Sequence, residues 1–156
     1  MKVGVLKEIK VKEKRVSMTP AGVLAMKRAG HTLLIEKSAG EGSGYSDDDY
    51  SSAGAIMVDS PQEIFKQSDM VMHVKEPLPP EYDLIREDQI VFTYLHLAAD
   101  EQQTNALIKS KAICIAYETI QKADGSLPLL TPMSEVAGRM AIQQGADRKS
   151  GSAGMP

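Results

Sequence analysis

The chain has 156 residues, of which 42% are apolar and 25% are charged, and its formal net charge is -3 at pH 7. These values are typical of one globular domain with a sizeable core, and they argue against intrinsic disorder, a fibrous repeat or a membrane span. The slightly negative charge gives no reason to expect nucleic acid or an anionic membrane as a partner, so a small-molecule ligand is favoured.

Short apolar runs alternate with helical segments along the chain, which predicts an α/β fold: a Rossmann-like (flavodoxin-like), largely parallel sheet flanked by helices. The first strand is expected over residues 2–6, and a charged loop follows it through Arg15. A helix then begins with Thr19 as its N-cap and a proline at its first position, and Gly30 ends it. A second strand is expected over residues 31–36.

The glycine-rich passage Gly40 to Gly44 begins like a dinucleotide-binding fingerprint, but Tyr45 stands where the third glycine belongs. A short polar helix over residues 47–53 follows, where such a fingerprint would have an apolar helix. We therefore predict a tight connecting loop here rather than a phosphate-binding loop.

The middle of the chain continues the alternation. Ser60, Pro61 and Glu63 form a capping-box pattern at the start of a helix. Prolines at positions 77, 79 and 80 predict a loop with no helical continuation. Further strands are predicted over residues 70–74, 90–94 and 112–117, with a helix over residues 100–109 between the last two.

The last part of the chain changes in character. After a polar turn at Asp124 and Gly125, residues 127–130 are expected to return to the core. Thr131 and Pro132 start a final helix that runs to about Gln144, and the end, RKSGSAGMP, is typical of a tail or linker. We expect a domain over residues 1–130, a long helix over 131–146 and a flexible tail over 147–156.

The cysteine and histidine content limits the chemistry. A single cysteine, Cys114, excludes an intrachain disulfide framework, and its apolar surroundings favour a core residue over a nucleophile. Three histidines without nearby cysteines or helical ligand spacing give no reason to expect a metal. The start of the chain shows no secretory signal, so a cytoplasmic location is expected.

Four polar side chains follow strand ends or lie in strand-end loops: Arg15, Lys75, His96 and Glu118. If the sheet is parallel they converge on one edge, where α/β proteins bind ligands. Such a set suits a small carboxylic acid, because Arg can hold a carboxylate, Lys can polarise a carbonyl or imine, and His can transfer a proton near neutral pH.

Structural alternatives stay open for each of these residues. Arg15 lies in a charged loop and could be solvated surface, and Lys75 could form a surface pair with Glu76. His96 could be a polar residue that closes a strand. The other two histidines, at positions 31 and 73, are more typical of structural positions, since the second lies inside a predicted strand.

Several longer motifs carry a resemblance to a known family: KEIK at 7–10, RVSMTP at 15–20, VKEPLP at 74–79, TYLHLAA at 93–99, AYET at 116–119 and LPLLTPMSEVAGRMA at 127–141. In this order they resemble the N-terminal, substrate-binding region of alanine dehydrogenase, within the alanine dehydrogenase and pyridine nucleotide transhydrogenase family. The resemblance covers residues 1 to about 146.

The resemblance implies reversible NAD-dependent oxidative deamination of L-alanine to pyruvate and ammonium, and a homo-oligomeric assembly. Arg15 and Lys75 match the family's substrate-binding residues, and His96 matches its catalytic histidine. Two further residues, Tyr94 and Glu118, match positions near the substrate pocket. Positions near the cofactor are matched by Met133 and Ser134.

The sequence also departs from the family pattern, since the NAD-binding Rossmann domain is absent from these 156 residues. We therefore expect negligible turnover from the chain alone. Three alternatives stay open: a fragment of the related NAD-binding transhydrogenase subunit, a non-catalytic oligomerisation or binding module, and a structural fragment without function.

Overall fold

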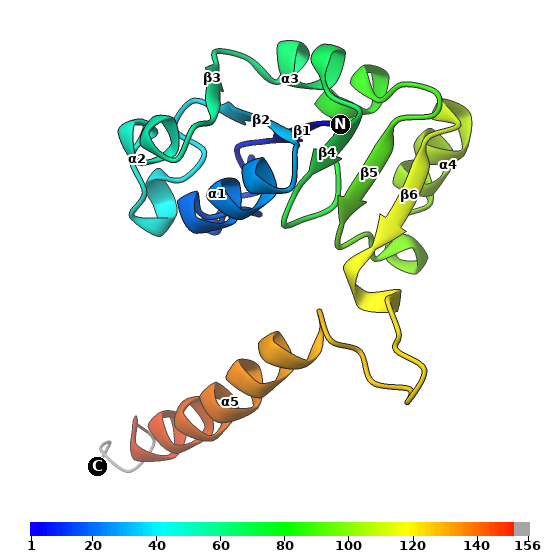
Figure 1. Cartoon of the computed structure of the whole chain (residues 1–156). Coiled ribbons are helices and arrows are strands. Elements are labelled where there is room, and N and C mark those ends of the chain that lie inside the picture. The colour runs from blue at the N-terminus through cyan, green and yellow to red at the C-terminus, as the bar shows by residue number, and fades with distance from the viewer. Residues whose placement is uncertain (152–156) are drawn as a thin grey trace. The chain divides into compact units, whose positions relative to one another are not determined.

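The computed structural model describes residues 1–151, with side chains as far as residue 146 (Figure 1). The chain divides into two compact units, Met1–Ala116 and Tyr117–Pro156. The predicted boundary at residue 130 stays a prediction. The last five residues of the predicted tail lie outside the described residues.

The first unit is built on one sheet of six parallel strands. The strands are β1 (Lys2–Val5), β2 (Thr32–Glu36), β3 (Ile56–Val58), β4 (Met70–Met72), β5 (Ile90–Thr93) and β6 (Ile113–Ala116). Their order in space, β3-β2-β1-β4-β5-β6, is the Rossmann order, in which the winding reverses between β1 and β4. The predicted α/β, Rossmann-like fold is confirmed.

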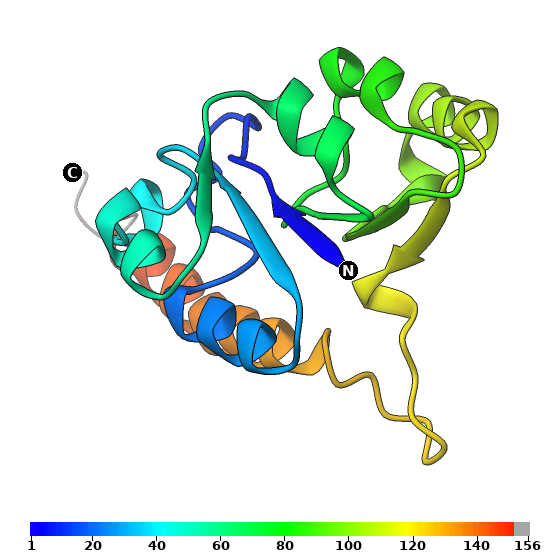
Figure 2. The ribbon, with the colours of Figure 1, turned by 45° about the horizontal axis from the view of Figure 1, so that its top comes forward.

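Helices cover both faces of the sheet in the first unit (Figure 2). On one face lie α1 (Pro20–Arg28) and α2 (Asp47–Ser52), and on the other lie α3 (Pro61–Gln67) and α4 (Glu101–Ser110). Side chains alternate between the two cores along each strand, since Leu33 and Ile35 of β2 join the α1 side and Leu34 joins the α3 side. Each core is therefore held between helices and sheet.

The predicted helix starts are observed. The Thr19 hydroxyl accepts a hydrogen bond from the Gly22 amide at the start of α1, and Ser60 caps α3 by accepting from the Glu63 amide. The α4 helix is capped by Asp100 in the same way. These side chains satisfy amide groups that have no partner inside the helix.

Three local predictions were wrong. Residues 56–58 form the edge strand β3, which the sequence reading did not predict. The proline-rich segment does continue helically, as the 3-10 helix η2 (Pro79–Leu84), because two prolines can occupy the first turn, where no amide partner is needed. Strand β4 ends at Met72, two residues earlier than predicted, so His73 lies in the following loop rather than in the strand.

The second unit contains η4 (Tyr117–Thr119), a turn in which Gly125 has a φ of 84°, and α5 (Thr131–Gly151). The α5 helix continues beyond the predicted end near Gln144 and takes in the first residues of the predicted tail. Residues 127, 128 and 130 are half-buried and Leu129 is 40% exposed, and the predicted return of this segment to the core stays a prediction. Among the described residues, no helix is both long and apolar enough to cross a membrane.

Candidate functional site at the switch point of the sheet

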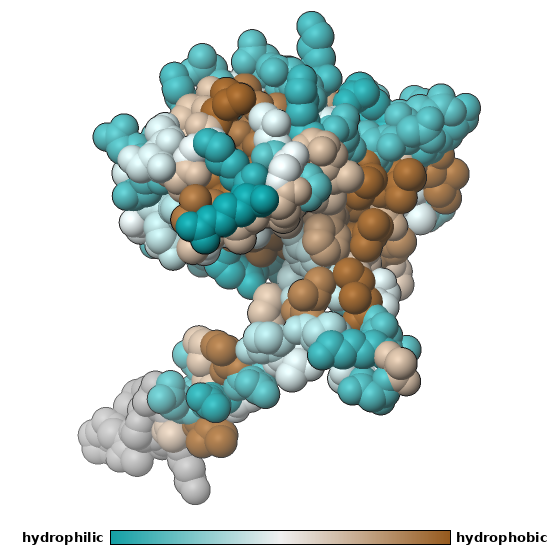
Figure 3. Space-filling model, viewed as in Figure 1, coloured by the Kyte–Doolittle hydropathy of each residue, from teal (hydrophilic) through white to brown (hydrophobic). Residues whose placement is uncertain are grey.

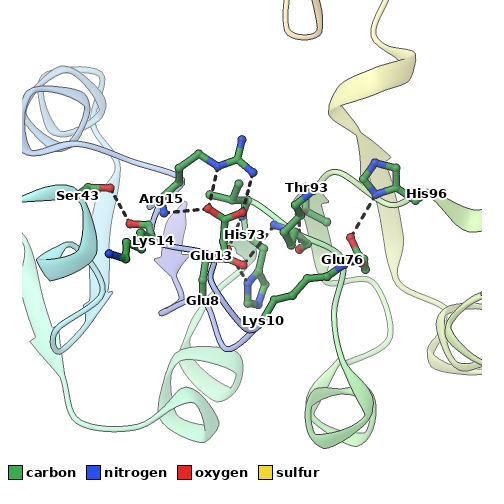
Figure 4. Close-up of polar contacts among 12 residues, drawn as sticks. Glu8, Lys10, Glu13, Lys14, Arg15, Ser43, His73, Glu76, Thr93 and His96 are labelled. Carbon is green, nitrogen blue, oxygen red and sulfur yellow. Dashed lines mark hydrogen bonds and ion pairs between the residues drawn. The ribbon is translucent and has the colours of Figure 1, made fainter. Parts of the chain in front are cut away.

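Polar side chains gather at the carboxyl ends of β1, β4 and β5, beside the point where the strand order reverses (Figure 4). They come from the loop after β1, the loop after β4 and the residues that follow β5, all within the first unit. A crevice forms at such a point because the loops on either side lead away in opposite directions. Two further 3-10 helices, η1 (Glu41–Ser43) and η3 (Leu97–Ala99), border the cluster.

A buried ion network lies beneath this edge of the sheet. The Nδ1 atom of His73 lies 3.2 Å from Oε1 of Glu8, and its Nε2 atom lies 3.0 Å from Oε1 of Glu81. The three side chains are no more than 5% exposed. Burial acts to lower the pKa of His73, but the two carboxylates outweigh it and raise the pKa to about 9. His73 is therefore a protonated imidazolium at neutral pH.

Glu8 also fixes the backbone that carries Lys75. Its carboxylate accepts hydrogen bonds from the Val74 amide at 2.6 Å and from the Lys75 amide at 3.4 Å. On the other side, the Thr93 hydroxyl donates to the Lys75 carbonyl at 2.7 Å. The backbone of Lys75 is thus held between groups from the loop after β1 and from β5, while its side chain stays half-buried.

Arg15 forms a paired contact with a carboxylate of its own loop. Its Nε and Nη2 atoms donate to the two oxygens of Glu13 at 2.8 and 2.7 Å, and its amide donates at 2.9 Å. These contacts with Arg15 lower the pKa of Glu13 to about 2, and the charge of Lys75 contributes in the same direction. The positive charges of Arg15 and Lys75 therefore both stabilise the ionised carboxylate of Glu13.

The glycine-rich loop supports the backbone next to Arg15. A Cβ atom at Gly42 would lie 2.7 Å from the Lys14 carbonyl oxygen, and the Ser43 hydroxyl donates to the same oxygen at 2.9 Å. Gly44 completes the turn with a φ of 84°. The prediction of a tight connecting loop is confirmed. A cavity of about 120 Å³ lies between this loop and residues 7–15.

His96 stands at the far end of the cluster. Its backbone adopts a left-handed conformation, with φ 48° and ψ 38°, and its Nδ1 atom lies 3.2 Å from Oε2 of Glu76. The other oxygen of Glu76 pairs with Nζ of Lys10. The His96 ring stacks on the buried Tyr94 ring, with centroids 6.0 Å apart and an interplanar angle of 19°. The alternative of a surface pair between Lys75 and Glu76 is not observed, since Glu76 pairs with His96 and Lys10.

The structure thus brings four predicted site residues to one edge of the first unit: Arg15, Lys75, Tyr94 and His96. The other three belong to the second unit. Glu118 is half-buried in η4, whereas Met133 and Ser134 lie in the first turn of α5, with Met133 37% exposed.

Three acidic residues of this cluster were missed by the sequence reading: Glu8, Glu13 and Glu76. Glu8 and Glu76 come shortly after strand ends, the same signal that selected Lys75 and His96, but charged loop residues are usually solvated. Cys114 is half-buried, and burial raises the pKa of its thiol, in keeping with the predicted core role.

Outside the strand-end cluster, the described residues contain a second cavity but no metal-binding group. This second cavity, of about 420 Å³, is lined by η2 and α4 and shares no residue with the strand-end cluster. No group of three or more His, Cys, Asp or Glu side chains could hold a metal ion within the part of the chain that the structure describes. The strand-end cluster is therefore the candidate functional site.

Comparison with known proteins gives one consistent family. The family described as "Alanine dehydrogenase/PNT, N-terminal domain" matches residues 4–137. The alanine dehydrogenase of Methanococcus maripaludis is 56% identical over 146 residues, which are 94% of this chain and 39% of that protein. The alanine dehydrogenase of Geobacillus stearothermophilus is 53% identical over 146 residues, which are again 94% of this chain and 39% of that protein.

Solved structures agree with these relatives. An L-alanine dehydrogenase superposes with a TM-score of 0.89 at 50% identity, covering 94% of this chain and 40% of that one. A transhydrogenase from Sinorhizobium meliloti has a TM-score of 0.70 at 25% identity, covering 76% of this chain and 35% of that one. The chain spans about two fifths of the length of the alanine dehydrogenases that it matches.

Proposed function

Because the chain belongs to the alanine dehydrogenase/PNT N-terminal domain family, we propose that it carries the substrate-binding part of an NAD-dependent alanine dehydrogenase. The reaction is the reversible conversion of L-alanine into pyruvate and ammonium. One observation carries the proposal: the loops that carry Arg15 and Lys75 follow the neighbouring strands β1 and β4, and the Arg15 guanidinium already holds a carboxylate, that of Glu13, through two hydrogen bonds. The same two cations suit the carboxylate of pyruvate or alanine.

Each predicted residue has a role that its chemistry supports. Arg15 binds the substrate carboxylate through two parallel hydrogen bonds, as its fork now binds Glu13. Lys75, with its backbone fixed by Glu8 and Thr93, places an ammonium group against the substrate carbonyl or imine. His96 transfers the proton at that centre. Tyr94 stacks on the His96 ring. For Glu118, a position near the substrate is proposed from the family resemblance alone.

The first unit lacks the features of a pyrophosphate-binding site for NAD in its described residues. In a Rossmann-type site the pyrophosphate approaches a glycine-rich turn after the first strand. Here that connection carries the carboxylates Glu8 and Glu13. The space beside Gly42 is already occupied by the Lys14 backbone, so no ligand can approach it there. Two carboxylates and a closed glycine position do not fit a pyrophosphate. Met133 and Ser134 are proposed to border the cofactor.

Alanine dehydrogenase is favoured over the transhydrogenase alternative. The chain is 50% identical to the solved alanine dehydrogenase but 25% identical to the solved transhydrogenase. A site with Arg15, Lys75 and His96 at one sheet edge also suits an amino or keto acid. A non-catalytic binding module remains the second candidate, supported by the exposed apolar side chains of β6. The cytoplasmic location and the homo-oligomer are part of the same proposal.

The proposal is tested by titrating pyruvate into the ¹⁵N-labelled 156-residue chain and recording amide and side-chain NMR shifts. We expect saturable shifts at Arg15, Lys75 and His96 at millimolar pyruvate. Arg15→Gln and Lys75→Gln should each weaken binding by roughly tenfold or more, because each removes a charge-assisted contact. Lys14→Gln, which removes an exposed neighbouring charge, is the matched control and should bind normally. Saturation that leaves these three residues unshifted, or no shift at all, overturns the proposal.

A further inference from the structure

We infer that Glu76 is a positioning residue that fixes the tautomer and orientation of the His96 ring, and that Lys10 in turn holds Glu76. This inference rests on the proposed function for the role of His96 as the proton-transfer group. The placement of Glu76 beside His96 stands on the geometry alone.

Three separate segments bring these residues together, as Figure 4 shows for all three side chains. Lys10 comes from the loop after β1, Glu76 from the loop after β4, and His96 from the chain that follows β5. One Glu76 oxygen meets Lys10 Nζ, and the other lies 3.2 Å from His96 Nδ1. The Glu76 side chain is only 14% exposed, whereas that of His96 is 48% exposed.

An ionised carboxylate can only accept hydrogen bonds, so its contact requires a proton on His96 Nδ1. Burial acts to raise the pKa of Glu76, but the hydrogen bonds from Lys10 and His96 prevail and hold it below its ordinary value. Glu76 is therefore ionised at neutral pH. The neutral imidazole must then carry its lone pair on Nε2, which becomes the atom that accepts and returns a proton.

The rest of the surroundings hold the ring in the same orientation. Tyr94 stacks on one face at a 19° interplanar angle, and the left-handed backbone at φ 48° turns the side chain of His96 toward Glu76. A non-glycine residue in this conformation is strained, and such strain is concentrated at functional sites. A half-exposed imidazole without these contacts would sample several rotamers and both tautomers.

The test reads the tautomer directly in the 156-residue chain without ligand, from ¹⁵N shifts of labelled histidine at a pH where the ring is neutral. We expect the Nδ1–H form to dominate at His96. Glu76→Ala should shift the tautomer ratio toward Nε2–H by roughly fivefold or more, the factor that one modest hydrogen bond supplies. Glu76→Asp should restore part of the ratio, and Lys10→Gln should give an intermediate value.

Glu87→Ala is the matched control, since it removes an exposed carboxylate that pairs with Lys111 outside the cluster. It should leave the His96 ratio unchanged. His31 and His73, identified by their own Gln variants, serve as internal references in each spectrum. A dominant Nε2–H form in the wild-type chain, or a ratio that Glu76→Ala does not move, overturns the inference.

Pyruvate titration separates the two proposals. Glu76→Ala should change the pyruvate Kd by less than roughly threefold, because Arg15 and Lys75 remain, whereas the tautomer changes. If the wild-type chain shows the expected tautomer but binds no pyruvate, the proposed function fails and the positioning by Glu76 stands. If pyruvate binds but the tautomer is insensitive to Glu76, the inference about Glu76 fails alone.

Discussion

His73 links the protonation of one buried side chain to the stability of the loops that carry the site. Its folded-state pKa of about 9 lies above its ordinary value of 6.5. A raised pKa contributes stability that is fully present below the ordinary value and is lost as the pH rises through the folded value. We therefore predict that the free energy of unfolding falls between about pH 7 and pH 10, by on the order of 3 kcal/mol from this group.

Urea denaturation at a series of pH values measures this fall. His73→Gln should lack the component that wild type loses above pH 7, since no imidazolium remains between Glu8 and Glu81. His31→Gln, which changes a histidine near the N-terminus, should keep the wild-type profile. If His73→Gln is too unstable to fold, the wild-type ¹⁵N spectrum still decides: a His73 ring that is neutral at pH 7.5 contradicts the prediction.

The left-handed backbone at His96 predicts a trade between stability and binding. Glycine adopts this conformation without the Cβ clash, so His96→Gly should raise the free energy of unfolding by about 0.5–1 kcal/mol. It should also abolish the pyruvate-dependent signal at this position. Lys111→Gly, at the C-cap of α4 with φ 57°, should stabilise similarly but leave pyruvate binding unchanged. Thermal unfolding measures the stability of the two variants, and pyruvate titration measures their binding.

Single residues show where sequence reasoning stops. The placement of Lys75 and His96 at strand ends was predictable, because a strand end can be read from where an apolar run stops. The partners of these residues were not, since Glu8 and Glu76 contact groups 66 and 20 positions away. A single sequence holds no signal for which of many loop carboxylates turns inward.

At the scale of elements, the glycine loop determines the position of the loop that carries Arg15. A methyl group at Gly42 would lie 2.7 Å from the Lys14 carbonyl oxygen and 3.0 Å from its Cα, so the Lys14–Arg15 backbone must move. We predict that Gly42→Ala weakens pyruvate binding by roughly tenfold, because a bidentate contact depends on where the guanidinium is held.

The control for this substitution is another glycine-to-alanine change. A Cβ atom at Gly138, inside α5, would meet nothing within 4 Å. Gly138→Ala should therefore stabilise the helix by about 0.5–1 kcal/mol and leave the affinity for pyruvate unchanged. Isothermal titration with each variant makes the comparison, and equal affinities for wild type and Gly42→Ala would refute the role of the glycine loop.

Helix starts were the most predictable elements, because a capping side chain and its amide partner are three residues apart at Thr19, Ser60 and Asp100. Strand β3 was missed because it has three residues and an exposed Ile56, so it shows neither an apolar run nor clear alternation. Its pairing with β2 decides its structure, and that pairing joins residues about 22 positions apart.

At the scale of the whole molecule, apolar side chains remain exposed on the edge strand β6. Ile113 is 50% exposed and Ile115 is 39% exposed, and apolar residues gather at this edge of the sheet in Figure 3. The face opposite α4 therefore offers apolar surface near an edge strand, which favours association. We predict that the 156-residue chain self-associates at micromolar to millimolar concentration.

Sedimentation velocity over a wide concentration range measures this association. Replacing Ile113 and Ile115 together by glutamate should shift the chain toward monomer. Val11→Glu, which changes an isolated apolar side chain that is 87% exposed in a loop, should leave the association unchanged. A wild-type chain that stays monomeric throughout the range would remove the support for a homo-oligomer.

The sequence predicted the alternation of helices and strands, and hence a parallel α/β sheet, but not the order of its strands. Each strand is read from its own residues, whereas the order depends on which face each crossover helix covers. The meeting of the Arg15 and Lys75 loops follows from that order, since β1 and β4 are neighbours although residues 2–5 and 70–72 are far apart in the chain. The position of Arg15 and Lys75 at one edge of the sheet was predictable, but the contact between Arg15 and Glu13 was not.

The central position of β1 and β4 has a consequence for how the molecule opens. Each of these strands is hydrogen-bonded on both sides, whereas β3 and β6 lie at the edges of the sheet. Amide deuterium uptake should therefore be slowest at paired residues such as Val5 and Met72 and fastest at the edges. Partial opening of either edge then leaves the loops of Arg15 and Lys75 anchored, so the binding site should outlast local unfolding elsewhere in the sheet.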